Sequence, residues 1–153
     1  MAGDFRDELG VLLGAKETIA SQKFTIYMPD RDRKNNSIHP AVEEYIESAI
    51  RLLTEINLGA TRLPWAEGSF KRAREQPTVT ERTTIIYSFL KEPEVFLNQF
   101  DRIKELLYKF GNEMNQDEVF VEFSGETEGG EHFYQRAYSI ERQTFAPEDS
   151  QQS

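Results

Sequence analysis

The sequence has no cysteine among its 153 residues. This absence excludes disulfide bonds, zinc or iron–sulfur sites with cysteine ligands, and thiol catalysis. The sequence also lacks an apolar run of the ~18 residues that a membrane-spanning helix requires. Its first ten residues are acidic, whereas a secretory signal begins with basic residues followed by an apolar stretch. We therefore expect a cytoplasmic protein that does not act in a membrane.

Basic residues are scarce relative to acidic ones, with 18 Lys and Arg against 27 Asp and Glu and a net charge of −9. A field of this sign repels polyanions, so we expect no direct contact with nucleic acid. The simplest role of the charge in this acidic protein is solubility. A second interpretation is an acidic inhibitor of a nucleic-acid-binding protein, although no block of five or more like charges demands it.

Groups that bind metals or phosphates are also scarce. The two histidines, His39 and His132, do not have the spacing of a metal site. Asp30-Arg31-Asp32 resembles the start of a calcium loop, but the twelfth position is Ala41, where a glutamate is required. The stretch 10–16 has neither the spacing nor the Ser/Thr of a phosphate-binding loop. We expect no metal and no cofactor.

Two amphipathic helices are the strongest local signals in the chain. Apolar residues recur every three or four positions over Pro40–Asn57 and over Glu94–Asn112. With 38% hydrophobic residues, the chain is suited to a single domain over 1–146, followed by a disordered tail over 147–153. Leucines and a phenylalanine at helical spacing also predict an N-terminal helix over about 4–19, weakened by Gly10 and Gly14.

Five strands are predicted between and after the helices. They are Lys23–Met28, Ala60–Trp65, Arg82–Leu90, Asp117–Ser124 and His132–Arg142. Strand, helix, strand, strand, helix, strand is the order of the ferredoxin-like α+β fold, an antiparallel sheet with two helices on one face. The last strand is expected to pair back as a hairpin.

The face of the sheet that these helices leave open is the first candidate for a functional surface. Alternation along two of the strands places Thr25, Tyr27, Phe120 and Glu122 on it. An aromatic face requires a cover. The cover could be the N-terminal helix, a second subunit in a homodimer, or a ligand. RNA-recognition domains stack bases on this face, but Thr83–Leu90 lacks their signature.

A second candidate is the segment around the single tryptophan. Trp65 and Glu67 precede a charged loop that we expect over 66–81, and Trp65 could stack on a ligand while Glu67 accepts a hydrogen bond or a proton. Alternatively, Trp65 closes the end of the core. Glu81 would lie beside Glu67 if the loop folds back, although chance pairs of carboxylates are expected in so acidic a chain.

The region from about Phe24 to Phe123 resembles small bacterial ferredoxin-like domains of uncharacterised function. The residues that carry the resemblance are Trp65-Ala66-Glu67-Gly68 and Phe110-Gly111-Asn112-Glu113 leading into Val119-Phe120-Val121. The resemblance implies the fold and carries no active site across.

These observations favour a non-enzymatic binding or accessory domain that recognises a small ligand or a protein partner. Its site would combine the open sheet face with the 66–81 loop, through Tyr27, Trp65, Glu67, Tyr87 and Phe120. The alternative is a small-molecule enzyme of the dimeric α+β barrel type. In that case Glu67, Glu81, Tyr87 or His39 would transfer protons.

Overall fold

The computed structural model describes residues 5–15, 19–127 and 132–147. Within these ranges the elements follow the order α1, β1, α2, β2, β3, α3, α4, β4, β5, α5. Their bounds are α1 Phe5–Leu12, β1 Gln22–Pro29, α2 Val42–Asn57, β2 Thr61–Phe70, β3 Val79–Phe89, α3 Pro93–Asn98, α4 Phe100–Glu113, β4 Glu118–Glu126, β5 Phe133–Glu141 and α5 Arg142–Phe145.

The strands form one antiparallel sheet in the order β2-β3-β1-β4-β5. The central strand β1 pairs with β3 on one side and with β4 on the other. Strand β5 pairs with β4 as the expected hairpin and extends the sheet. The α+β class predicted from the sequence is confirmed.

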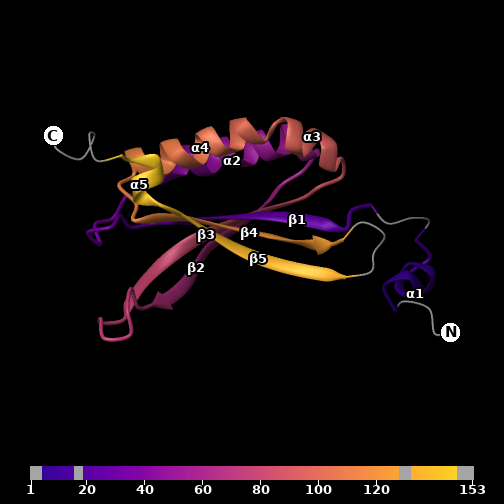
Figure 1. Ribbon diagram of the computed structural model, residues 1–153, viewed down its shortest axis with the longest axis horizontal. Coiled ribbons are helices and arrows are strands. Elements are labelled where there is room, and N and C mark those ends of the chain that lie inside the picture. Colours follow the sequence, from indigo (N-terminus) through magenta and orange to yellow (C-terminus); the bar gives the residue numbers. More distant parts are fainter. Residues whose placement is uncertain (1–4, 16–18, 128–131, 148–153) are drawn as a thin grey trace.

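Helices α2, α3 and α4 lie together on one face of the sheet, and no helix of the described chain lies over the other face (Figure 1). Even-numbered residues of β1 and odd-numbered residues of β4 point toward these helices. The core between the two layers includes Phe24, Ile26, Met28, Ile46, Leu53, Ile86, Ile103, Leu107, Phe110, Val119 and Val121, all buried. Burying such side chains stabilises the fold by ~1.5–3 kcal/mol each before chain entropy is subtracted.

Both predicted core helices form, with changed bounds. Helix α2 begins at Val42, two residues after Pro40, and ends where Leu58 adopts a left-handed conformation with a φ of 69°. The second helix divides into α3 and α4 because the backbone at Gln99, with a φ of −100° and a ψ of 3°, departs from helical geometry. The periodic apolar stripe continues across this break, so the sequence pattern does not reveal it.

The prediction of a long loop over 66–81 is wrong. Strand β2 continues to Phe70 and β3 starts at Val79, so the connection is only residues 71–78. The register of β2 on β3 shifts between Leu63 and Ala66. A bulge there bends β2 at Trp65, whose φ is 33°. Gly68 and Pro77 suggested an interruption, but Gly68 pairs within the strand and Pro77 lies in the turn.

The described part of the N-terminal helix is α1, shorter than the predicted 4–19. It lies beyond the end of the sheet rather than over its open face (Figure 1). Its Val11 and Leu12 are 81% and 76% exposed, so this helix does not supply the expected cover. The predicted tail falls outside the described residues from 148 onward. No helix in the described ranges has the length and hydrophobicity to cross a bilayer.

Candidate functional site

A pocket with a volume of about 960 Å³ opens on the helix-free face of the sheet. Its lining comes from β1, the β2–β3 hairpin, the start of β4 and the junction of β5 with α5. Pockets of ~300–1,000 Å³ suit small molecules. The main lining side chains are Tyr27, Ile85 and Phe120 on the sheet, Arg31 and Arg33 after β1, Glu81 and Arg72 on the hairpin, and Asp117, Glu118, Glu141 and Arg142 at the other side.

The floor of the pocket is a row of side chains across neighbouring strands. Tyr27 is the register partner of Ile85 on one side and of Phe120 on the other. The rings of Tyr27 and Phe120 meet edge to face, with centroids 5.1 Å apart. Phe120 is 37% exposed, so its ring remains available to a ligand. Such a surface can pack against a planar base or contact a cation.

The phenol of Tyr27 is held in its protonated form. Partial burial, together with the nearby Glu122 carboxylate, raises its pKa above the usual value. The Tyr27 hydroxyl donates a long hydrogen bond of 3.5 Å to Glu122, whose second carboxylate oxygen accepts a bond of 2.9 Å from Gln135. Tyr27 therefore acts as a hydrogen-bond donor and an aromatic surface, and it does not serve as a base near neutral pH.

Glu81 is the group with the most altered acidity in the pocket. Burial and the neighbouring Asp30 and Glu118 carboxylates raise its pKa to about 7, against an opposing effect of Arg72. Its carboxyl group makes no hydrogen bond or ion pair with any described residue. Its register partner is Gly68, which has no side chain, so the space beside the carboxyl group is open. A carboxyl group with this pKa exchanges protons readily near neutral pH.

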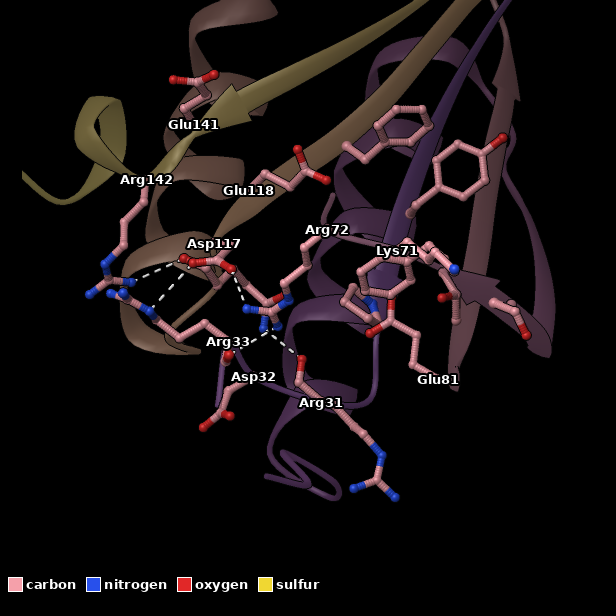
Figure 2. Close-up of a pocket in the computed structure, with 18 of the residues that line it drawn as sticks. Arg31, Asp32, Arg33, Lys71, Arg72, Glu81, Asp117, Glu118, Glu141 and Arg142 are labelled. Atoms are coloured by element: carbon pink, nitrogen blue, oxygen red, sulfur yellow. Dashed lines mark hydrogen bonds and ion pairs between the residues drawn. The ribbon is translucent and has the colours of Figure 1, made fainter. Parts of the chain in front are cut away.

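Arginine side chains from separate segments meet at the other end of the pocket. Arg72 Nη1 lies 2.7 Å from Asp117 Oδ2, and Arg33 Nε lies 3.4 Å from Asp117 Oδ1. Arg72 also donates a 2.9 Å bond to the Arg33 carbonyl oxygen. In Figure 2, Arg33, Asp117 and Arg142 lie together on the left and Glu81 lies on the right. The charges of the pocket are therefore separated in space.

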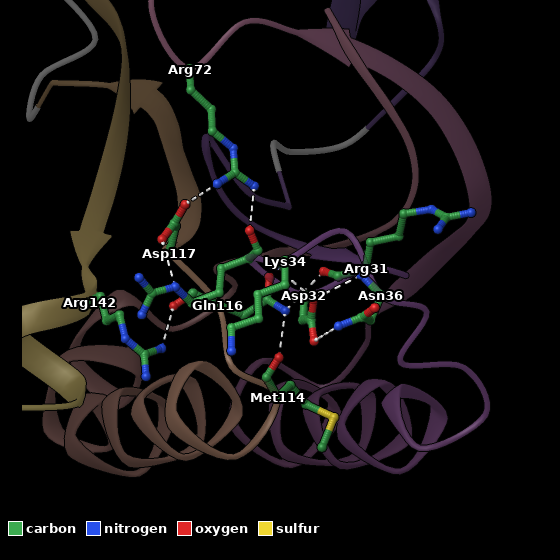
Figure 3. A network of polar contacts seen from close by, with 10 residues as sticks. Arg31, Asp32, Lys34, Asn36, Arg72, Met114, Gln116, Asp117 and Arg142 are labelled. Carbon is green, nitrogen blue, oxygen red and sulfur yellow. Dashed lines mark hydrogen bonds and ion pairs between the residues drawn. The ribbon is translucent and has the colours of Figure 1, made fainter. Parts of the chain in front are cut away.

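Gln116 holds this end in place. It is only 4% exposed, and its side-chain amide donates to the carbonyl oxygens of Arg31 and Met114, at 3.1 and 3.0 Å. Arg142 Nη1 donates a 3.0 Å bond to the Gln116 carbonyl oxygen. Figure 3 shows how these contacts join the segment after β1, the start of β4 and α5. The network fixes segments that are far apart in the sequence.

Three of the five residues predicted as a site line the pocket, namely Tyr27, Glu67 and Phe120. Trp65 lies outside the lining and packs against His39 and the Arg62 guanidinium, with ring centroids of Trp65 and His39 5.7 Å apart. Tyr87 also lies outside the lining, on the same sheet face, where its ring contacts Phe89 and the Lys23 ammonium.

The suggested pairing of Glu67 with Glu81 does not form in the hairpin. Glu67 is the register partner of Arg82, and Glu81 is that of Gly68, so the two carboxylates point to alternate sides. The partners that raise the pKa of Glu81 are Asp30 and Glu118. Continuing the alternation from Phe120 back to Glu118, and from Ile85 back to Glu81, would have placed both on the open face. No sequence signal indicates the pairing of Arg72 with Asp117.

Among the described residues, no three His, Asp or Glu side chains are grouped to hold a metal ion. The pocket instead offers an aromatic floor, a partly protonated carboxyl group and an arginine-rich end. These groups can bind a charged organic molecule and exchange a proton with it.

No protein family model matches this chain, and no curated protein sequence matches it. Two solved structures share the fold. A phage SAM lyase in complex with S-methyl-5′-thioadenosine is 21% identical, with a TM-score of 0.54 over 84% of this chain and 96% of that one. A phage SAM lyase in the apo state is 17% identical, with a TM-score of 0.52 over 82% and 93% of the two chains.

This similarity overturns the expectation of a non-enzymatic binding domain. The chains that share the fold over nearly their whole length are enzymes, and one of them holds a small molecule. The comparison favours the alternative prediction, a small-molecule enzyme.

Proposed function

We propose that this protein is an enzyme that cleaves S-adenosylmethionine and releases S-methyl-5′-thioadenosine. The observation that carries the proposal is the pocket in which the Glu81 carboxyl group, with a pKa of about 7 and no partner among the described residues, lies on the same face as Tyr27 and Phe120. The similarity in fold to phage SAM lyases supports it.

The chemistry of the products defines which bond breaks. The sulfur of S-adenosylmethionine is a sulfonium cation with methyl, adenosyl and aminocarboxypropyl substituents, and S-methyl-5′-thioadenosine retains the first two. The bond from sulfur to the aminocarboxypropyl chain must therefore break, and its electron pair stays on sulfur, which becomes neutral. The four-carbon fragment completes its bonding in one of two ways. It loses a proton from carbon to a base and becomes an alkene with no net charge, or its own carboxylate oxygen bonds to the carbon that leaves sulfur, which gives a lactone that keeps the ammonium charge and releases no proton.

Each part of the pocket has a role in this reaction. The rings of Tyr27 and Phe120 provide a surface for the adenine or the sulfonium group. Glu81, with Glu118 nearby, supplies negative charge that attracts the cation. If the fragment loses a proton, Glu81 is the base, since its pKa near 7 suits proton transfer at neutral pH.

The finer description of the fold belongs to the same proposal. The order β2-β3-β1-β4, with α2 and α4 on one face, supports a ferredoxin-like sheet to which β5 is added. Kinship with small bacterial ferredoxin-like domains, a homodimer and a cytoplasmic location stay predictions from the sequence.

The test is to incubate the purified protein with S-adenosylmethionine and to measure S-methyl-5′-thioadenosine by liquid chromatography and mass spectrometry. We expect release by the wild type and a rate reduced at least ~100-fold in Glu81→Gln, in line with the usual contribution of an acid–base group. Glu105→Gln, on an exposed position of α4, is the matched control and should retain the wild-type rate. Absence of release by a folded wild type would overturn the proposal.

A further inference from the structure

Three arginines meet at one end of the pocket, around Asp117 and the backbone of Gln116. They are Arg33, from the segment after β1, Arg72, from the β2–β3 connection, and Arg142, at the start of α5. The other two cations of the lining lie apart from them: Lys71 is on the side of Glu81, and the Arg31 guanidinium donates to the Asn35 carbonyl oxygen. The guanidiniums around Asp117 thus form a local cationic group in a pocket that also holds carboxylates.

Two of these cations share a single carboxylate. Asp117 lies 2.7 Å from Arg72 Nη1 and 3.4 Å from Arg33 Nε, so one negative charge is set against two positive charges. A guanidinium has five N–H donors, and within the described part of the chain Arg72 donates only to Asp117 and to the Arg33 carbonyl oxygen. Donors and positive charge therefore remain for an anionic group of a ligand.

The arginine-rich end is also preorganised. Buried Gln116 ties the backbone at Arg31 to the start of β4, directly before Asp117. Asp117 in turn holds Arg72 of the hairpin loop across 45 residues of sequence. Because the guanidiniums are held before a ligand arrives, less conformational freedom is lost when it binds.

The two ends of the pocket are close enough to interact, since the positive charge of Arg72 acts on the Glu81 carboxyl group. A ligand that matches both ends carries a cation and an anion joined by a short link. A neutral nucleoside thioether has neither charge. An amino-acid sulfonium has a cation for the side of Glu81 and a carboxylate for the arginine end.

We propose that Arg72 and Arg33, positioned by Asp117, form a carboxylate subsite that selects ligands bearing an amino-acid chain. This inference rests on the proposed function, because it assigns the part of the substrate that the arginine end holds. It makes Arg72 a specificity-determining residue.

The subsite can be tested with ligands that the reaction does not consume. S-adenosylhomocysteine is a neutral thioether with an amino-acid chain, its decarboxylated analogue keeps the amine but lacks the carboxylate, and S-methyl-5′-thioadenosine lacks both. Their affinities for the full chain can be measured by isothermal titration calorimetry. We expect S-adenosylhomocysteine to bind about tenfold more tightly than the other two, the size expected for one charge-assisted pair that stays partly in water.

The variant Arg72→Gln should lower the affinity for S-adenosylhomocysteine about tenfold and leave that for S-methyl-5′-thioadenosine unchanged. Arg33→Gln is the second variant and should also lower the affinity for S-adenosylhomocysteine. Circular dichroism verifies that both variants fold. Arg74→Gln is the matched control, because it removes the same charge from the same exposed loop at a residue outside the pocket lining.

Two results would overturn the subsite alone. One is equal binding of all three ligands by the wild type. The other is a loss in Arg72→Gln that is the same for S-methyl-5′-thioadenosine as for S-adenosylhomocysteine. If the wild type binds none of the three, the proposed function fails, and the subsite fails with it.

Discussion

Glu81→Gln should change how the stability of the protein depends on pH. The pKa of Glu81 is about 7 in the folded chain, against 4.5 in the unfolded chain. Between these values the folded state binds more protons than the unfolded state, so the free energy of unfolding falls as pH rises. Above about pH 7 Glu81 is ionised in both states, and the free energy of unfolding does not fall further because of it. Glutamine cannot ionise, so the variant does not show this loss.

The size of this change in the free energy of unfolding follows from the shift in the pKa of Glu81. Each pKa unit corresponds to ~1.4 kcal/mol, so a rise from 4.5 to about 7 has an upper bound of ~3.5 kcal/mol. Glu81 is partly exposed, and solvent screening reduces the effect. We expect the free energy of unfolding of Glu81→Gln, relative to wild type, to be ~1–2 kcal/mol higher at pH 8 than at pH 4.5.

Urea unfolding of both proteins at pH values from 4.5 to 8 measures this difference. The carboxyl groups of Asp32, Glu43 and Glu55 have lowered pKa values in the folded chain, and their contribution to the pH dependence is the same in both proteins. Glu105→Gln is again the control and should run parallel to the wild type. Parallel curves for wild type and Glu81→Gln would refute the raised pKa.

Three further substitutions test other parts of the account. Phe120→Ala removes one of the two rings of the pocket floor and should reduce the release of S-methyl-5′-thioadenosine about tenfold. Trp65→Phe changes a residue outside the lining and should retain the wild-type rate. Equal effects of the two substitutions in rate assays would contradict this placement. A Cβ atom at Gly68 meets only the Glu81 carbonyl oxygen, at 4.0 Å, so the backbone has room for a side chain there. Gly68→Val should therefore fold with its melting temperature nearly unchanged but lose activity as its side chain enters the pocket, and full activity would contradict this placement. Gly111→Ala places a methyl group 2.9 Å from side-chain atoms of Phe145 and Val119. The substitution should lower the free energy of unfolding, measured by urea denaturation, by ~1–3 kcal/mol. An unchanged free energy of unfolding would contradict this and would show that α5 can shift to make room.

The layers of the fold could be predicted because periodicity reports burial directly. The stripe of α2 and the alternation of β1 and β4 both reflect one buried face, and both residue sets are buried in the structure. The hairpin of β2 and β3 could not be predicted in the same way, since nearly all of β2 is exposed on both faces. Backbone pairing forms it, and the sequence carries little trace of such pairing.

The residues of the site fall into the same two groups, those that strand alternation reveals and those that it does not. Tyr27 and Phe120 could be found because strand alternation places them on the open face. The sequence offers Glu81 as a proton-transfer candidate, but its raised pKa depends on Asp30 and Glu118, which come from other strands or their ends. The pairing of Arg72 with Asp117 joins two loops 45 residues apart, and no local pattern predicts such a contact.

If the protein cleaves S-adenosylmethionine as proposed, the pocket on the helix-free face binds the nucleoside product of the reaction. A crystal structure of the protein grown with S-methyl-5′-thioadenosine tests it most directly. We expect the ligand on the sheet against Tyr27 and Phe120, with its sulfur on the side of Glu81. Density for the ligand elsewhere, with this pocket empty, would contradict it.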